Sequence, residues 1–128
     1  MIARLGELWG AKDVLQKLAK TKFKAKVSYK LMKVIDQANK EFEPFSKVRM
    51  ELFTKYGEKK DDTITIKPEN IEQFSNEMSE LEATEVEIKF SISLEEIAEA
   101  ELTPSELYLL DFMFRDEIAA SQSEDNKE

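Results

Sequence analysis

Carboxylates and lysines are the only abundant groups in this chain that could do chemistry. The sequence has no histidine, which removes the commonest general acid–base near neutral pH, and no cysteine, which removes thiolate metal sites and disulfides. Carboxylates alone can run glycosidase or metal-dependent chemistry. No acidic pair here, however, is flanked by the aromatic residues or glycines that usually shape a pocket. We therefore expect no catalytic residues, no metal and no cofactor, and we expect that the protein is not an enzyme.

Two adjacent carboxylates, Asp61 and Asp62, could be interpreted as a cation site. A calcium cage needs six or more oxygen ligands, and no further carboxylates lie beside this pair to supply them. Both residues sit in a polar stretch from Glu58 to Asp62, so the sequence favours a turn in a polar loop.

A lysine cluster between residues 17 and 33 is a candidate nucleic-acid site. One interpretation is a stripe that binds phosphates. The other, which we favour, is a solvated face that partly neutralises acidic residues elsewhere, because arginine is absent and Phe23 and Tyr29 are the only rings nearby. Nucleic acid is therefore an unlikely partner. The cluster consists of Lys17, Lys20, Lys22, Lys24, Lys26, Lys30 and Lys33.

The net charge of −8 is the sum of two unlike halves. Residues 1–60 contain 15 Lys and Arg against 7 Asp and Glu, a balance of +8, and residues 61–128 contain 4 against 20, a balance of −16. Opposite charges attract, so the two halves are expected to pack against each other.

The length of 128 residues predicts a single domain, which we place at residues 1–118, followed by a disordered acidic tail at 119–128. No apolar run approaches the roughly 20 residues that span a bilayer, and no signal-peptide core is visible. We expect a protein without a membrane partner that is made in the cytoplasm and kept there at least until assembly.

The rest of the chain is organised around a long helix expected at about residues 26–56. Its apolar residues recur at alternating steps of four and three, with Arg49 as a polar interruption. Pro44 lies inside this stretch and predicts either one kinked helix or two helices; we favour the kink because Phe42 and Phe45 keep the spacing across it. Gly57 is expected to end the helix in the left-handed conformation. The apolar seam consists of Leu31, Ile35, Ala38, Phe42, Phe45, Leu52 and Tyr56.

Alternating β-branched and apolar residues predict strands at 63–66 and at 86–92, which we expect to pair into a small ribbon of undetermined direction. Helices are predicted at 1–20, where Gly6 and Gly10 weaken the pattern, and after Pro68, whose apolar stripe matches the width of the seam. The predicted fold class is α+β, mostly α: a long Pro-kinked helix packed in a helical hairpin or bundle with a small two-stranded β element.

Two capping boxes predict the last helices. Ser93 with Glu96 opens a short helix to Ala100, and Thr103 with Glu106 opens a longer one at Pro104. The second helix is apolar on nearly every side, so it is either a central core helix or a helix with one face that docks another protein. Arg49 either packs and pairs within the chain or contacts a partner. The candidate partner-binding residues are Leu107, Tyr108, Phe112, Met113, Phe114 and Arg49.

Five short stretches in the same order resemble a family of small proteins of unknown function from tailed bacteriophages and prophages. The resemblance covers most of residues 20–115 and brings no catalytic residues. It implies a phage origin, in or near the structural and late gene regions. The stretches are Ala25–Lys30, the Phe42–Phe45 region with Lys55–Glu58, Pro68–Ile71, Thr84–Ile88 and Leu102–Leu107.

Together these features lead us to expect a non-enzymatic phage structural or assembly protein, associated with the virion, tail or connector, that acts by protein–protein binding. Self-association is a further alternative. The main competing expectation is a phage anti-defence or host-takeover inhibitor whose acidic C-terminal half mimics nucleic acid. Both place the protein in the host cytoplasm during infection, and the first also places it in the virion.

Overall fold

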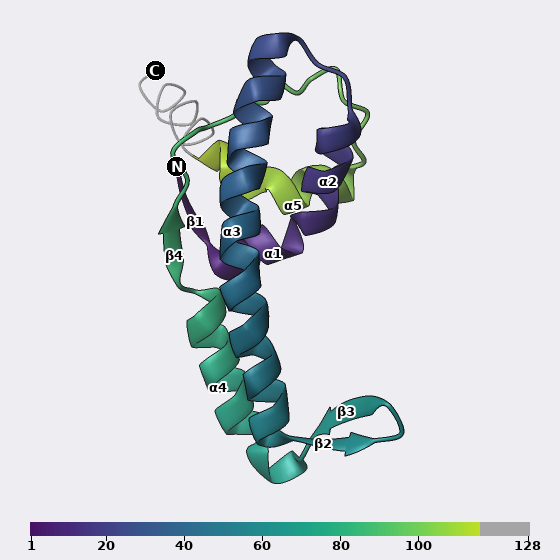
Figure 1. Ribbon diagram of the computed structural model, residues 1–128, viewed down its shortest axis with the longest axis vertical. Coiled ribbons are helices and arrows are strands. Elements are labelled where there is room, and N and C mark those ends of the chain that lie inside the picture. Colours follow the sequence, from purple (N-terminus) through teal and green to yellow (C-terminus); the bar gives the residue numbers. More distant parts are fainter. Residues whose placement is uncertain (116–128) are drawn as a thin grey trace, which may run out of the picture.

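A computed structural model describes residues 1–115 and is built around one helix, α3 (Ala25–Tyr56), which is about 48 Å long (Figure 1). We call residues 1–45 and 83–115 the head, and residues 46–82 the arm, which extends downward in Figure 1. The head adds the elements β1 (Ile2–Arg4), α1 (Leu5–Gly10), α2 (Lys12–Lys20), β4 (Glu85–Glu87), α5 (Pro104–Leu110) and a 3₁₀ turn at Asp111–Phe114. The arm adds β2 (Gly57–Lys60), β3 (Thr63–Ile66), a 3₁₀ turn at Pro68–Asn70 and α4 (Ile71–Glu82).

The fold class is the predicted one, α+β and mostly α. Helix α3 runs through Pro44 without a break, which confirms a single helix rather than two. Proline cannot donate a hydrogen bond to the carbonyl four residues earlier, on Lys40. Both residues are exposed, so water can satisfy that carbonyl and the helix tolerates the proline.

The head contains the hydrophobic core. Side chains from α1, α2, the first half of α3 and the segment after β4 bury one another there, with Leu8, Leu18, Val34, Ile88, Ile92 and Leu110 among the most buried. Between residues 46 and 82, in contrast, Tyr56 is the only side chain of the buried class. The arm is therefore a two-helix extension whose contacts are half-exposed.

Helix α4 lies against the second half of the α3 seam, as its apolar stripe predicted. The ring of Phe74 is 5.1 Å from that of Phe53 and 6.4 Å from that of Tyr56, and the Lys55 ammonium lies 3.7 Å from the Glu77 carboxylate. Where the arm meets the head, Gly6 allows α1 to approach α4 closely, because a Cβ at Gly6 would be 2.9 Å from the Glu82 Cβ.

The predicted strand pairing is wrong. Residues 63–66 do form a strand, but β3 pairs with β2 in an antiparallel hairpin, from Gly57 opposite Ile66 to Lys60 opposite Thr63. The polar sequence of β2 gave no strand signal. Asp61 and Asp62 form the turn, and both have positive φ, 46° and 57°, as a two-residue type I′ hairpin requires.

The other predicted strand, 86–92, is shorter than expected and lies in the head. Only Glu85–Glu87 is paired, antiparallel to Ile2–Arg4, and the ladder continues through two hydrogen bonds between Met1 and Ile88. The alternation persists beyond the strand, since Ile88 and Ile92 are buried while Lys89 and Ser91 are exposed. The alternation of apolar and polar residues over 86–92 therefore reflects burial against the core and not a longer paired strand.

Two helix predictions also need correction. Residues 1–20 form β1, α1 and α2 rather than one helix; the break at Ala11 lets Leu8 and Leu18 both reach the core. The Ser93–Glu96 box is present, with a 3.2 Å bond from the Glu96 N–H to Ser93 Oγ, but it is followed by turns instead of an α-helix. Backbone bonds from Ala98 and Ala100 reach back three residues, so a regular helix does not propagate.

The oppositely charged halves do pack together. Lys17 pairs with Glu106 at 2.9 Å, Lys30 with Glu96 at 2.8 Å, and Lys55 with Glu77, so three lysines of the first half meet carboxylates of the second. The predicted acidic tail at 119–128 lies outside the described residues.

Gly57 follows α3 in an extended conformation, with φ −102°, and not in the expected left-handed one. Glycine is needed there for space: a Cβ would be 2.3 Å from the Phe53 carbonyl oxygen and 2.5 Å from Ile64 Cγ2.

We predict that Gly57→Ala lowers the free energy of unfolding by about 1–3 kcal/mol through overpacking. Gly10→Ala is the control, because its Cβ would meet Leu109 at an ordinary 3.9 Å. Urea unfolding measures both, and equal stabilities would contradict the steric argument.

Candidate protein-binding surface

Helix α5 is held in place at its first turn by a capping box. The Thr103 hydroxyl accepts a hydrogen bond from the Glu106 N–H at 3.2 Å, and Glu106 Oε1 accepts one from the Thr103 N–H at 2.9 Å. Lys17 on α2 donates to the same carboxylate and to the Glu101 carbonyl oxygen, both at 2.9 Å. These bonds confirm the predicted helix start and fix α5 beside α2.

These contacts lower the pKa of the Glu106 carboxyl from its ordinary value, first through the Thr103 backbone N–H and then through the Lys17 ammonium. The pKa of Glu96 is lowered in the same direction, first by its hydrogen bond from Lys30 and then by the Ser93 N–H. Two capping carboxylates thus join the segment 93–110 to lysines on α2 and α3.

The exposed side of α5 is apolar. Leu107, Tyr108 and Leu109 are 39%, 80% and 40% exposed, and three consecutive residues span about 200° of a helix. The helix is therefore covered along one side, where Leu110 is buried, and open on the other. We call Leu107, Tyr108 and Leu109 the α5 face.

Two hollows flank this face. One, of about 320 Å³, lies between α5 and α1 and is lined by Gly10, Leu109, Phe112 and the ion pair between Glu7 and Arg115, with Gly6, Tyr108 and Asp111 completing it. The other, of about 400 Å³, is lined by Pro104, Ser105, Tyr108 and Leu109. Tyr108 and Leu109 thus form a ridge between two depressions.

Three of the predicted partner-binding residues do not belong to the α5 face. After Leu110 the α-helix tightens into a 3₁₀ turn, and Phe112, Met113 and Phe114 of that turn are 6%, 6% and 2% exposed. All three pack in the head core, and Phe112 also lines the hollow between α5 and α1. The residues after α5 are therefore core, as the first alternative expected, whereas α5 itself carries an open face, and docking of another protein there stays a prediction.

Arg49 lies away from α5, on α3 where the arm begins. Its guanidinium carbon is 5.7 Å from the centre of the Trp9 ring and 5.0 Å from that of Phe53. Trp9 in turn contacts Phe42 and Phe45, with ring centres 5.7 Å and 5.2 Å away. Arg49 therefore packs between aromatic rings of head and arm in a cation–π role, which is the packing alternative and not the ion-pair one.

Leu109, Gly10 and the Glu7–Arg115 pair are the parts of the surface that the sequence-based prediction missed. Leu109 lies between predicted neighbours and could have been included on helical spacing. The contribution of α1 arises from packing between residues about 100 positions apart, for which a single sequence carries no signal.

Among residues 1–115, no group of three or more His, Cys, Asp or Glu is arranged to hold a metal ion. No helix in the described residues is long and apolar enough to cross a bilayer.

Comparison with family models, with curated proteins and with solved structures finds no match to this chain. Its surface has to be interpreted from its own geometry.

The lowered pKa values predict a pH dependence of stability. A carboxylate with a depressed pKa in the folded state stabilises that state above its unfolded pKa, about 4.3, and the contribution is lost as pH falls through the folded value. At neutral pH we expect Glu96→Gln to unfold at a lower urea concentration than wild type. Below a pH of about 4 the two urea midpoints should converge.

Glu106→Gln should behave in the same way, whereas Glu99→Gln, an exposed glutamate with no ion pair to a described residue, should track wild type throughout. A difference between wild type and Glu96→Gln that stays constant across the pH range would contradict this assignment.

Proposed function

We propose that this protein is a non-enzymatic bacteriophage structural or assembly protein that binds another phage protein through the α5 face. The observation that carries the proposal is the open apolar side of α5, with Tyr108 80% exposed on a helix that is otherwise fixed in place. Interfaces are commonly anchored by a few aromatic or aliphatic side chains on rigid elements, surrounded by hollows that partner side chains fill.

The chemistry of the face supports a protein partner. Tyrosine contributes a large, rigid ring with a polar end, and the Tyr108 hydroxyl makes no hydrogen bond with a described residue. The two leucines add apolar area, and the Glu7–Arg115 pair at the edge of one hollow provides the polar rim typical of interfaces.

The phage origin is supported by the resemblance of five ordered stretches to a tailed-phage family. Most of these stretches lie at structural positions of the fold, such as the start of α3, the end of α3 at Tyr56–Gly57 and the capping box of α5. In this proposal the protein acts in the host cytoplasm during infection and remains with a tail, connector or other virion component.

A second candidate function is inhibition of a nucleic-acid-binding host enzyme by an acidic surface. One observation favours it: six glutamates between positions 80 and 99 are exposed and form no ion pair with a described residue, whereas Glu77 and Glu96 are paired with lysines. They lie on α4, β4 and the segment after it. The six are Glu80, Glu82, Glu85, Glu87, Glu95 and Glu99.

For the main proposal we predict that Tyr108→Glu weakens partner binding by roughly thirtyfold, because a central aromatic anchor contributes about 2 kcal/mol. The matched control is Ile71→Glu, which places the same charge at an exposed apolar position on the arm. Tagged variants are compared by purification from infected cells with mass spectrometry, followed by binding measurements on the recovered phage protein.

Retention of the same partner by Tyr108→Glu, or the absence of the protein from both virions and assembly intermediates throughout infection, would contradict the main proposal. Unfolding curves of both variants establish that the fold is intact.

For the second candidate, replacing Glu80, Glu82, Glu85 and Glu87 by glutamine should abolish inhibition of a DNA-binding host enzyme, because the mimic loses four charges. The inhibition assay uses purified host nucleases with duplex DNA. Inhibition that persists in the glutamine variant, or that is lost in Tyr108→Glu, would assign the activity to another surface.

A further inference from the structure

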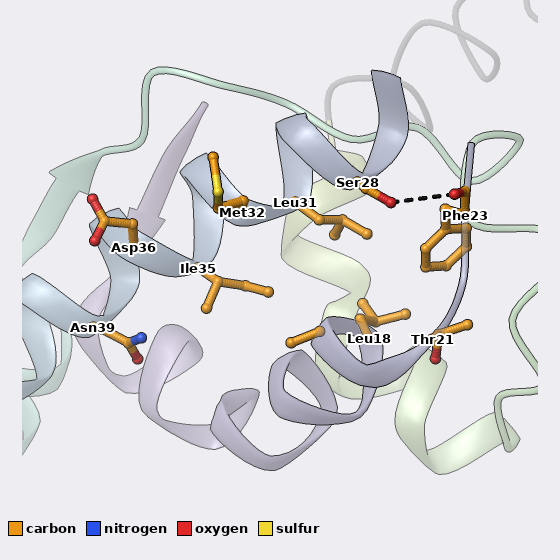
Figure 2. A pocket seen from close by; sticks show the side chains of 10 residues that line it. Leu18, Thr21, Phe23, Ser28, Leu31, Met32, Ile35, Asp36 and Asn39 are labelled. Atoms are coloured by element: carbon orange, nitrogen blue, oxygen red, sulfur yellow. Dashed lines mark hydrogen bonds between the residues drawn. The ribbon is translucent and has the colours of Figure 1, made fainter. Parts of the chain in front are cut away.

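A third hollow, separate from the two beside the α5 face, lies in the head between the end of α2 and the first turns of α3 (Figure 2). It is a cleft of about 350 Å³. Leu18 from α2 and Leu31 and Ile35 from α3 point into it from opposite sides, and Phe23 from the connecting segment closes one end. The Ser28 hydroxyl donates to the Phe23 carbonyl oxygen at 3.3 Å and holds that segment against α3.

The cleft is open to solvent along one side. Met32 on its edge is 54% exposed, and Ala19, Asp36 and Asn39 in its lining are exposed as well. The one acidic lining residue, Asp36, is paired with Lys40 at 3.2 Å and so contributes little negative charge. An apolar floor with an open edge suits the side chains of a peptide better than an enclosed small molecule.

Positive charge gathers on the segment at one end of the cleft, next in sequence to its lining residues. Of the seven clustered lysines, Lys17 and Lys30 are ion-paired and Lys33 lies over the Tyr29 ring at 5.6 Å. The remaining four, Lys20, Lys22, Lys24 and Lys26, are exposed and form no ion pair with a residue of the described range 1–115. Lys20, Lys22 and Lys24 alternate in sequence with the lining residues Ala19, Thr21 and Phe23.

We propose that this cleft binds an acidic amphipathic peptide segment of a partner protein, whose large apolar side chains enter the space between α2 and α3 while its carboxylates meet the free lysines. Charge complementarity favours this occupant: the four lysines beside the cleft form no ion pair within residues 1–115 and attract anions, and the apolar floor favours anions that are attached to large apolar side chains. Nucleic acid supplies phosphates but no aliphatic anchors for Leu18, Leu31 and Ile35.

This inference does not depend on the α5 face. The two sites use different elements, α5 with α1 for one and α2 with α3 for the other, so a variant of either can be tested while the other remains intact.

The test is selection of peptides of about 12 residues from a random displayed library on the purified wild-type protein, followed by fluorescence anisotropy of the enriched peptides. We expect enriched peptides to be net acidic with two or more large apolar residues. Affinity should fall about tenfold or more between roughly 50 mM and 500 mM salt, because exposed charges are screened.

Two variants locate the binding site. The first is a triple variant that reverses the charge beside the cleft, Lys20→Glu/Lys22→Glu/Lys24→Glu. Its matched control makes the same change on three exposed lysines of the arm, Lys59→Glu/Lys60→Glu/Lys67→Glu. Met32→Glu places a carboxylate at the edge of the cleft, and its control is Met50→Glu at a similarly exposed arm position. We expect about a tenfold or greater loss of affinity for each cleft variant and an unchanged affinity for each control.

Failure to enrich any acidic amphipathic peptide would overturn the proposal, as would enriched peptides that bind all four variants equally. A labelled single-stranded DNA oligonucleotide forms the last arm of the experiment. Binding of the DNA that is lost in the lysine variant but kept in Met32→Glu, without peptide binding, would assign the lysines to nucleic acid and would likewise overturn it.

Discussion

The fold depends on one constraint: the apolar seam of α3 is longer than any other single element can cover. A helix of 32 residues has about nine turns, and α4, with 12 residues, covers little more than three of them. The first half of the seam is buried by α1, α2 and the segments after β4, where it joins a true core, and the second half is covered by α4, with β2 and β3 against its end. The division into a compact head and a thin arm follows from this difference.

The junction between the two parts is aromatic. Trp9 packs on Phe42 and Phe45 of the seam, and Arg49 continues the stack toward Phe53. A charged residue on an apolar seam is tolerated because its guanidinium lies over ring faces, which attract a cation, while its exposed part reaches water. Arg49 thus interrupts the apolar spacing without interrupting the packing.

Local signals in the sequence predicted the elements better than their partners. The bounds of α3 follow from apolar spacing, the start of α5 from the Thr103–Glu106 box, and the Asp61–Asp62 turn from its composition. Strand pairing failed because β2 is polar and β1 reads as part of a helix, so the true partners of β3 and β4 carried no β pattern. Of the candidate partner-binding residues, Leu107 and Tyr108 are exposed, but the 3₁₀ turn that buries Phe112–Phe114 has no signature in residue spacing.

The two open surfaces of the head differ in charge as well as in place. On α5, Lys17 is bonded to Glu106 and the face is apolar, whereas Lys20, Lys22, Lys24 and Lys26 beside the α2–α3 cleft form no ion pair within residues 1–115. The cluster of like charges is therefore divided: Lys17 and Lys30 pair with glutamates of the acidic half, and the lysines between them leave positive charge beside an apolar cleft.

The hairpin β2–β3 sits at the far end of the arm, whereas the elements of both open surfaces lie in the head (Figure 1). Exposed tight turns of this kind accept extra residues between their strands without disturbing distant packing. A short epitope or a fluorescent label inserted between Asp61 and Asp62 would therefore report on the location of the protein in cells while leaving the α5 face and the cleft unaltered.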